Sequence, residues 1–220
     1  NSMVGCWAIT EPDHGSDQLT VGMPWFKAPE ISGQVSARLE GDEWIINGQK
    51  SLWVSNGPNA THALLFLNID KSMDLAGGGV AIVPLDLPGV SKGGCLDKLG
   101  QRELPQGEII FENVRLPKHL MLVEPDIYET MLDATLALAN ATMGAIFTGV
   151  ARAAFEEALA YSKVRIQGGK PLCEHQLVQK KLFDMFQKVE TARAISRAAM
   201  NYNLSNFPPV TRYSILSKVY

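Results

Sequence analysis

Trp7–Asp17 reads WAITEPDHGSD, and the organisation of the chain can be inferred outward from this segment. A short apolar run ends at Thr10, and the prolines and glycines that follow force the chain to turn. Proline fixes φ, whereas glycine permits φ > 0 or a close approach of the backbone. Thr10, Gly15 and Ser16 can therefore offer several hydrogen-bond donors to one flat or anionic ligand. The pattern predicts a strand end that opens into a ligand-binding loop, although by itself it is equally typical of an ordinary turn.

A second motif downstream decides between these two interpretations. Ile45–Gly57 reads IINGQKSLWVSNG, and together the two motifs resemble the acyl-CoA dehydrogenase family. Phe111–Pro117, FENVRLP, resembles the strand that closes the middle β-domain of that family. Tyr161–Arg165, YSKVR, with Glu174–Gln176, EHQ, resembles a segment of the helical domain that follows. The four stretches occur in the family's order, so the resemblance covers nearly the whole chain.

Composition excludes several classes of function. The chain has 220 residues, of which 46% are hydrophobic, enough for a sizeable core in one large domain or two small ones. A net charge of −3 and a pI of 5.8 argue against binding of nucleic acid by electrostatic attraction. Cys6, Cys95 and Cys173 form no CxxC pattern, and the four histidines show no ligand spacing. These features indicate a reducing compartment and no structural zinc site.

Both ends of the sequence look cut. The chain begins at Asn1, a few residues before the first motif, and stops at Tyr220 inside a helical pattern. The resemblance implies a helical domain before the first motif and more helices after the last. We therefore expect a fragment of an α+β multidomain protein. Residues 1–122 are expected to form a middle β-barrel domain that binds flavin and substrate, and residues 123–220 an incomplete C-terminal antiparallel helical bundle.

The first half of the chain has the pattern of a β-domain. Short apolar runs are broken by turn residues, which is typical of a barrel or a sandwich. We expect Gly77–Gly79 to form a flexible loop between two of the strands. The predicted strands are 35–39, 44–47, 63–69, 80–83 and 108–114.

After Pro125 glycine and proline become rare and alanine more common. Residues 134–151 carry no charge, and at 18 residues the run approaches the length of a membrane span. Its polar residues and glycines favour a helix buried among other helices instead. Small side chains at Ala141, Ala145 and Gly149 are expected to let a neighbouring helix approach closely.

Two further helices complete the predicted bundle. Leu182, Met185, Val189, Ala192 and Ser196 fall on one face of an amphipathic helix, and charged residues fall on the other. A last helix is expected from Val210 onward, with Pro208 or Pro209 in its first turn. Three helices joined by short loops indicate an antiparallel bundle.

Binding of a flavin needs a flat apolar surface for the ring system and hydrogen bonds to its polar edges. Trp53 can supply the surface, and the Thr10 and Ser55 hydroxyls with nearby backbone N–H groups can supply donors. The alternative for Trp53 is a residue of the β-domain core. One extra residue between Lys50 and Trp53, relative to the commonest family spacing, could be absorbed by a bulge.

The resemblance implies roles for individual residues. It places Ser16 near the thioester and pantetheine of an acyl-CoA and Asn140 at a substrate-side position that is usually arginine. It places Arg165 and Gln176 at the flavin's pyrophosphate and adenosine, across a subunit interface, and a guanidinium suits phosphate oxygens. The residues implied to contact the cofactor are Trp7, Ile9, Thr10, Gly15, Ser16, Trp53, Val54, Ser55, Arg165 and Gln176.

The family's reaction is α,β-dehydrogenation of an acyl-CoA thioester. A carboxylate removes the α proton while the β hydrogen leaves as hydride to the flavin, so the base must have a pKa near the operating pH. The usual glutamate would lie beyond Tyr220, and the alternative position is occupied by Ala139. Either the base is outside this chain, or the protein is a divergent member; Glu129 is a reserve candidate, more typical of a solvated helix carboxylate.

The resemblance thus implies an FAD-dependent acyl-CoA dehydrogenase of fatty acid metabolism. It also implies a homodimer or homotetramer, an electron-transferring flavoprotein as redox partner, and a location in the cytoplasm or mitochondrial matrix. Two alternatives stay open: an acyl-CoA oxidase or flavin monooxygenase on the same fold, and a non-catalytic member with an assembly or acyl-binding role. We expect little or no turnover from the 220 residues alone.

Overall fold

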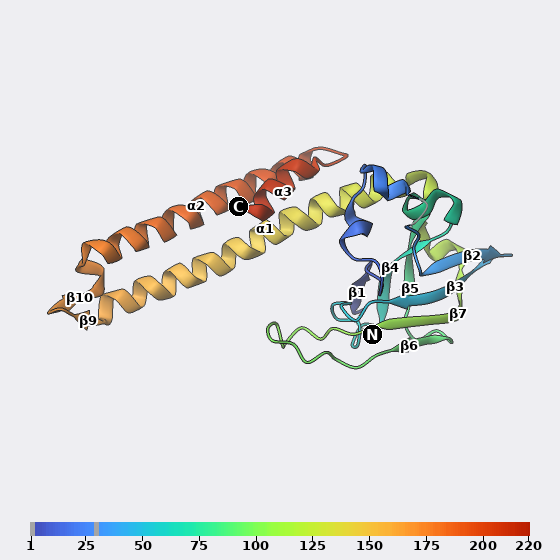
Figure 1. The fold of residues 1–220 in the computed structure, drawn as a ribbon, viewed down its shortest axis with the longest axis horizontal. Coiled ribbons are helices and arrows are strands. Elements are labelled where there is room, and N and C mark those ends of the chain that lie inside the picture. Colours follow the sequence, from blue (N-terminus) through green and yellow to red (C-terminus); the bar gives the residue numbers. More distant parts are fainter. Residues whose placement is uncertain (1–2, 29–30) are drawn as a thin grey trace. The chain divides into compact units, whose positions relative to one another are not determined.

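The computed structural model describes residues 3–28 and 31–220 of the chain (Figure 1). The chain divides into two compact units, Asn1–Leu132 and Asp133–Tyr220. The first carries the sheet, and the second is helical apart from a two-stranded hairpin. Each unit has its own packing.

In the described part of the first unit, eight strands form one mixed sheet in the order β6-β7-β3-β2-β4-β5-β8, with β1 added on β4. β1 runs parallel to β4, whereas β2–β3, β3–β7, β4–β5, β5–β8 and β6–β7 are antiparallel pairs. The strands are β1 (Gly5–Ala8), β2 (Ser36–Glu40), β3 (Glu43–Lys50), β4 (His62–Asn68), β5 (Gly78–Pro84), β6 (Val90–Lys92), β7 (Ile109–Pro117) and β8 (Met121–Val123).

The five predicted strands are present, each shifted by a few residues, but the sheet is not closed into a barrel. The sheet ends at β6 and β8, which have three residues each. Among the described residues, β6 pairs only with β7 and β8 only with β5. Closure of a barrel requires both edges of the sheet to pair with each other. The unit is therefore an open mixed sheet whose buried side chains form one hydrophobic core.

The glycine run expected to be a flexible loop is buried structure. Gly77 ends the 3-10 segment η3 (Lys71–Gly77), and Gly78 and Gly79 begin β5. A Cβ on Gly78 would lie 2.3 Å from the ring of Tyr128, and one on Gly77 would lie 1.8 Å from the Asp70 carbonyl oxygen. The expectation was wrong because the glycines are there for close packing, not for mobility.

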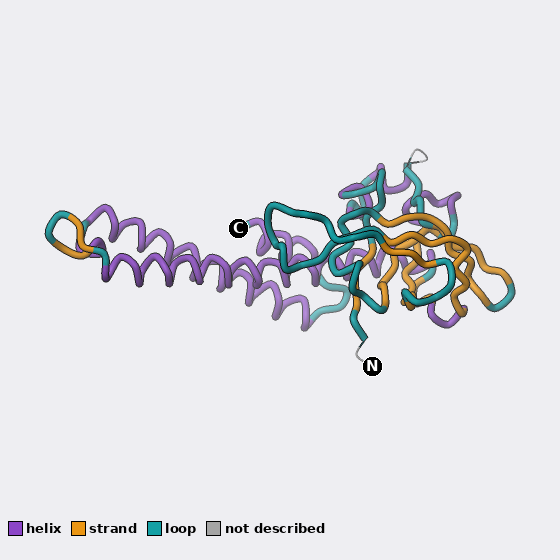
Figure 2. The backbone as a smooth tube through the Cα atoms, turned by 90° about the horizontal axis from the view of Figure 1, so that it is seen from below, coloured by secondary structure: helices purple, strands orange, loops and turns teal. Residues whose placement is uncertain are grey.

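The elements after β8 are α1 (Pro125–Val164), the short strands β9 (Ile166–Gln167) and β10 (Lys170–Pro171), η5 (Leu172–Glu174), α2 (Gln176–Ser205) and α3 (Thr211–Val219). α1 and α2 lie side by side and antiparallel (Figures 1 and 2). Thr148 and Ser196 approach to 3.2 Å between their hydroxyl oxygens, and the rings of Phe155 and Phe186 are 5.9 Å apart. The predicted antiparallel arrangement is thus confirmed for these two helices.

Two details of the helices differ from expectation. α3 approaches α1 most closely at Gly144, where a Cβ would lie 2.1 Å from the Ser217 hydroxyl. Ala145 is exposed, and a Cβ on Gly149 would meet nothing within 4 Å, so neither position makes the expected close contact. The phase of α1 turns Ala141 and Gly144 inward and Ala145 and Gly149 outward. α3 begins at Thr211, so Pro208 and Pro209 precede the helix and do not occupy its first turn.

α1 passes a length and composition test for a membrane span. The core helix of a soluble protein passes the same test. Its contacts with α2 and α3 through Thr148, Phe155 and Gly144 are those of a helix packed against other helices on one side. Of its apolar window, 28% is buried within the described residues.

A buried ion pair attaches the Trp7–Asp17 segment to the sheet. Lys50 Nζ on β3 lies 2.8 Å from Glu11 Oε1 and 2.8 Å from the Ile9 carbonyl oxygen, and both charged side chains are 1% exposed. The same carboxylate accepts the backbone N–H groups of Gln34 at 2.6 Å and Val35 at 3.0 Å. Burial lowers the pKa of Lys50 to about 8, and Glu11 opposes that shift. One carboxylate therefore joins β3 to the segment that leads into β2.

Gly48 allows this close approach. It has φ +127° next to a register shift between Ile46 and Gly48, and a Cβ there would lie 2.7 Å from Val35 Cα. L-residues rarely adopt that conformation, and the contact is with backbone, which cannot move aside cheaply.

We predict that Glu11→Ala lowers the free energy of unfolding by about 3–5 kcal/mol, because it leaves a buried ammonium without a counterion and two N–H groups without an acceptor. Lys50→Met should cost less, since the carboxylate keeps its two N–H donors. Urea denaturation measures both. Glu40→Ala, which breaks an exposed pair with Arg38, is the control, expected to cost roughly 0–1 kcal/mol. A Glu11→Ala variant as stable as the control would contradict the role given to the pair.

Gly48→Ala is expected to destabilise the first unit by at least about 2 kcal/mol, from backbone strain together with the clash against Val35. Gly94→Ala is the matched control, because a Cβ at Gly94 meets nothing within 4 Å. Thermal and urea unfolding of both variants provide the comparison. Equal stabilities would show that the β3 backbone can relax away from Val35.

Candidate functional site

A groove with a volume of about 670 Å³ opens on the first unit. The Trp7–Asp17 segment supplies one wall, and the end of β3 with the turn after it supplies the other. Its lining consists of Thr10, Glu11, Pro12, Asp13, His14, Gly15, Gln49, Ser51, Leu52, Trp53 and Glu108. Thr10 and Trp53, predicted from separate motifs, therefore share one groove.

Ser51 joins the two walls. Its hydroxyl lies 2.7 Å from Thr10 Oγ1, its backbone N–H donates to the Thr10 carbonyl at 3.0 Å, and its Oγ accepts the Trp53 N–H at 3.3 Å. The two hydroxyls are a donor and acceptor pair whose protons can reorient toward a ligand. Ser51 was not predicted from the sequence, although its place directly after Lys50, at the end of β3, was the available signal.

Trp53 lies in a turn and presents its indole to solvent. β3 ends at Lys50, Leu52 and Trp53 form the turn, and the Trp53 side chain is 61% exposed. The alternative that Trp53 is a core residue is therefore wrong. The irregularity of β3 lies upstream of Trp53, between Ile46 and Gly48.

Gln106 holds the chain after Trp53 in place. Its amide donates to the Trp53 carbonyl at 3.1 Å and to Ser55 Oγ at 3.0 Å, and Ser55 forms an isolated bridge with Gln106. Because the Ser55 oxygen accepts, its own proton remains available to a ligand. Nothing in the local sequence around Gln106 indicated this contact, which joins residues 51 positions apart.

Carboxylates line the other part of the groove. Glu108 accepts a hydrogen bond from the Gln49 amide at 2.5 Å. Asp17, which lies outside the lining, accepts from the Gly15 N–H at 2.7 Å and lies 2.7 Å from His14 Nδ1, so it fixes the turn around Gly15. Sequence reasoning did not find Gln49, Glu108 or the His14–Asp17 contact. Among the residues that the structure describes, no group of three or more His, Cys, Asp or Glu is arranged to hold a metal ion.

The remaining predicted residues of the first unit lie outside the groove lining. Trp7 is half exposed on β1 with its ring 5.8 Å from that of Phe66, and Ser16 is exposed at the start of η1 (Ser16–Leu19). Ile9 and Val54 are buried. The Ile9 carbonyl accepts a hydrogen bond from Lys50 Nζ, and the Val54 carbonyl accepts one from the Gly57 N–H.

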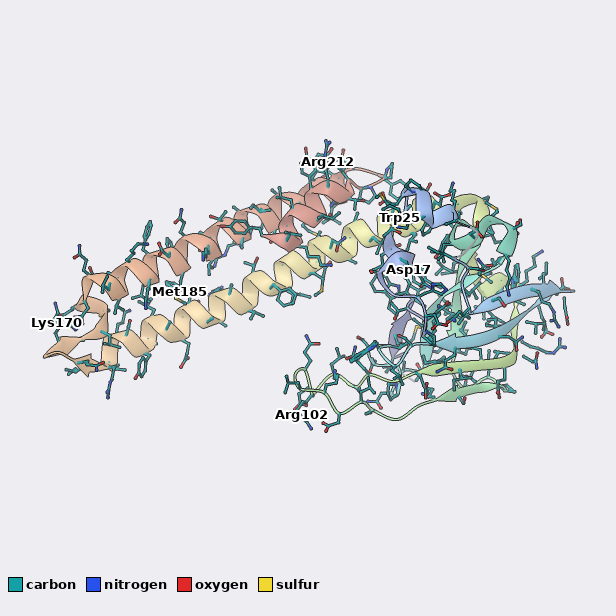
Figure 3. The ribbon with its side chains drawn as sticks, in the orientation of Figure 1. Asp17, Trp25, Arg102, Lys170, Met185 and Arg212 are labelled. Atoms are coloured by element: carbon teal, nitrogen blue, oxygen red, sulfur yellow. The ribbon has the colours of Figure 1, made fainter. Side chains whose placement is uncertain are left out.

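Three predicted residues belong to the second unit. Arg165 and Gln176 are both exposed at the end of the helical pair where β9 and β10 connect α1 to α2 (Figure 3, near Lys170). Asn140 lies on α1 beside Ala139, and both are partly buried. Glu129, in the part of α1 assigned to the first unit, forms an ion pair with Lys27 at 2.7 Å.

Two family models match the chain. The acyl-CoA dehydrogenase middle domain matches residues 6–114, and the acyl-CoA dehydrogenase C-terminal domain matches residues 130–220. Together they cover most of the sequence.

Individual relatives agree with the models. The chain is 34% identical over 217 residues to the mitochondrial short-chain specific acyl-CoA dehydrogenase of Rattus norvegicus, covering 98% of this chain and 49% of that protein. It resembles the solved butyryl-CoA dehydrogenase of Megasphaera elsdenii with a TM-score of 0.82 and 29% identity, over 97% of this chain and 52% of that one. It also resembles a glutaryl-coenzyme A dehydrogenase in complex with glutaryl-CoA, with a TM-score of 0.84 and 27% identity, over 96% and 50% of the two chains.

The chain spans about half the length of the relatives it matches. Over that half, the motifs, the mixed sheet followed by helices and both family models agree. The chain belongs to the acyl-CoA dehydrogenase family.

Proposed function

We propose that this chain is the middle domain, residues 1–122, and part of the C-terminal helical domain, residues 123–220, of a flavin-dependent acyl-CoA dehydrogenase. The observation that carries the proposal is the groove in which Thr10, Ser51 and an exposed Trp53 meet. Family membership alone would permit a chain whose cofactor site had been lost. The groove shared by these residues supports the proposal that the cofactor site has been retained.

The groove suits the ring system of FAD. Trp53 offers a flat, solvent-facing indole against which an aromatic heterocycle can stack, and a volume of about 670 Å³ accommodates a ligand of that size. The hydroxyls of Thr10, Ser51 and Ser55 provide donors for the polar edge of the ring. When bound, FAD would supply the acceptor for a hydride. The residues of this chain would orient the ring and exclude water from one of its faces.

The other assignments remain proposals that rest on the resemblance and on exposure. Gly15 and Ser16, at the exposed turn of the Trp7–Asp17 segment, would face the thioester and pantetheine. Arg165 and Gln176 are exposed, as a contact with the pyrophosphate and adenosine across a subunit interface requires. Trp7, Ile9 and Val54 would contribute through backbone or packing beside the ring.

The base that removes the α proton is proposed to come from outside these 220 residues. Ala139 has no titratable group, Asn140 cannot accept a proton at neutral pH, and Glu129 is paired with Lys27. Relatives about twice as long as this chain leave room for such a carboxylate. The thioester of an acyl-CoA is the proposed substrate, with an electron-transferring flavoprotein as the redox partner.

We further propose a homodimer or homotetramer in the cytoplasm or the mitochondrial matrix. The rat relative is mitochondrial by name, and a relative from Bacillus subtilis is a probable acyl-CoA dehydrogenase, so both settings occur among the relatives.

We predict that Trp53→Ala weakens FAD binding roughly tenfold, because the stacking surface for the ring is removed. Fluorescence titration of the chain, and of any longer protein that contains it, measures the dissociation constant. Trp25→Phe is the control, since Trp25 is also an exposed tryptophan but lies outside the groove lining. Equal affinities for wild type and the Trp53 variant would place the flavin elsewhere.

In a longer protein that contains this chain, we expect anaerobic addition of butyryl-CoA or glutaryl-CoA to bleach the flavin absorbance. Slow reoxidation in air, with fast reoxidation by an electron-transferring flavoprotein, is the expected outcome for a dehydrogenase. Rapid peroxide release or substrate hydroxylation would identify the oxidase or monooxygenase instead. A flavin that is bound but that no acyl-CoA bleaches would identify a non-catalytic member, as the replacement at Asn140 suggests.

A further inference from the structure

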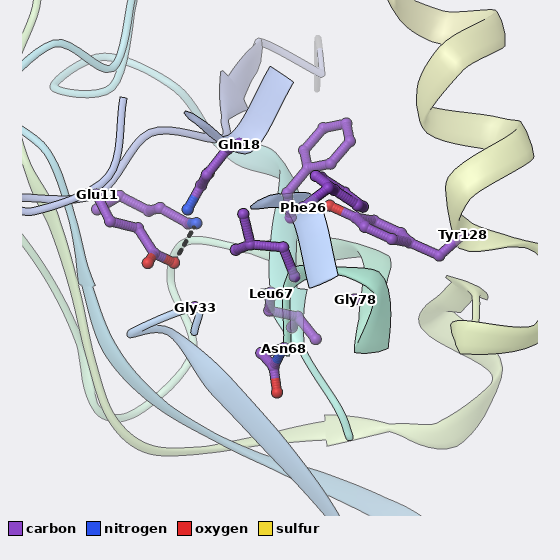
Figure 4. A pocket seen from close by; sticks show the side chains of 11 residues that line it. Glu11, Gln18, Phe26, Gly33, Leu67, Asn68, Gly78 and Tyr128 are labelled. Carbon is purple, nitrogen blue, oxygen red and sulfur yellow. Dashed lines mark hydrogen bonds and ion pairs between the residues drawn. The ribbon is translucent and has the colours of Figure 1, made fainter. Parts of the chain in front are cut away.

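A small cavity adjoins the Glu11–Lys50 ion pair and has no part in the groove's proposed chemistry (Figure 4). Its volume is about 20 Å³. The walls come from η1, η2 (Pro24–Lys27), the strands β3 to β5, η3 and the beginning of α1. The polar side chains among its lining residues are Glu11, Gln18, Lys50, Asn68 and Tyr128.

These polar side chains are removed from solvent. Gln18 is 7% exposed, Asn68 2% and Tyr128 6%. Figure 4 shows the Gln18 carboxamide extending toward the ion pair, with no contact marked between it and another residue drawn. Asn68 Oδ1 is buried with no hydrogen-bond partner among the described residues. Buried amides in proteins are almost always hydrogen-bonded, so the Asn68 oxygen requires an explanation. The Gln18 side chain is available for a further hydrogen bond because no contact to another residue is marked for it.

The hydrogen-bonding capacity beside Gln18 is not used up. Lys50 has three N–H donors, of which two are directed at Ile9 and Glu11. The Glu11 carboxylate has about four acceptor sites, of which three are used by Lys50, Gln34 and Val35. Burial, and after it the charge of Glu11, raise the pKa of Tyr128, so its hydroxyl keeps its proton.

The size of the cavity limits what it can hold. A site needs roughly 10–15 Å³ of accessible volume and two to four polar partners to hold one water molecule. The cavity has room for one water molecule and is too small for a second one or for any organic ligand. Apolar cavities of this kind stay dry, but this one is lined by an ion pair and two carboxamides.

We propose that the cavity binds one structural water molecule, which links the Gln18 carboxamide to the Glu11–Lys50 pair. The water accepts the third proton of Lys50 or an amide proton of Gln18 and donates to the remaining acceptor site of Glu11 or to the amide oxygen. Gln18 belongs to η1, which begins at Ser16 directly after Gly15 of the groove wall. The water therefore extends the anchoring of the ion pair to the far end of the same loop.

A crystal structure of the protein tests the site directly. The expected result is one isolated density peak in the cavity, within hydrogen-bond distance of Gln18 and of at least one atom of the ion pair. An empty cavity would overturn the proposal, as would a Gln18 amide that contacts Glu11 directly and fills the space.

Substitution provides an independent test with opposite expectations. If the water is present, Gln18→Leu removes its partner and lowers the folding equilibrium constant about tenfold. If the cavity is dry, the apolar side chain leaves stability unchanged or raises it, which would overturn the proposal. Gln187→Leu, at an exposed position on α2, is the control and should leave the constant within about twofold of wild type. Should the Gln18 variant not fold, the density in the wild-type cavity decides.

Discussion

The contact between Lys50 and Glu11 is the constraint on which the rest of the first unit depends. A charged pair that is 1% exposed is tolerated only when each remaining donor and acceptor is satisfied. Here the Ile9 carbonyl and the N–H groups of Gln34 and Val35 satisfy most of them, and one Lys50 N–H and one Glu11 acceptor site remain for the proposed water. Three segments that are distant in sequence therefore meet at one carboxylate. The pair's contribution is the specificity of this arrangement rather than a large net gain in stability.

This arrangement explains how a loop with little regular structure can form a binding wall. β3 directs Lys50 into the core, while Gln49 on its other face and Ser51 directly after the strand line the groove. The Thr10 hydroxyl contacts Ser51 one residue away from the Glu11 anchor. The groove is thus supported from behind by the pair, and its polar side chains are held by the same strand. Sites that must orient a flat ligand need such support, because small displacements weaken both stacking and hydrogen bonding.

What could be predicted from the sequence was local, and what could not depended on pairing between distant residues. Apolar periodicity located the strands and helices, and the motifs located Thr10 and Trp53, because these signals lie within a few residues. Gly144 is the close contact of α1 because Ser217 of α3 packs against it, and this packing cannot be inferred from the sequence around Gly144. Gln106 and Glu108 reach the site through a loop more than 50 residues from their partners. Likewise, no periodicity indicates whether two short edge strands will close a sheet, so the barrel was expected and an open sheet is found.

The two walls joined by Ser51 are proposed to hold one flavin ring against Trp53. A crystal structure of the protein with FAD tests this proposal most directly. Density for the ring is expected in the groove, parallel to the Trp53 indole, with its polar edge near the hydroxyls of Thr10 and Ser55. A flavin bound with its ring away from Trp53, or a groove filled by protein side chains in the complex, would contradict it.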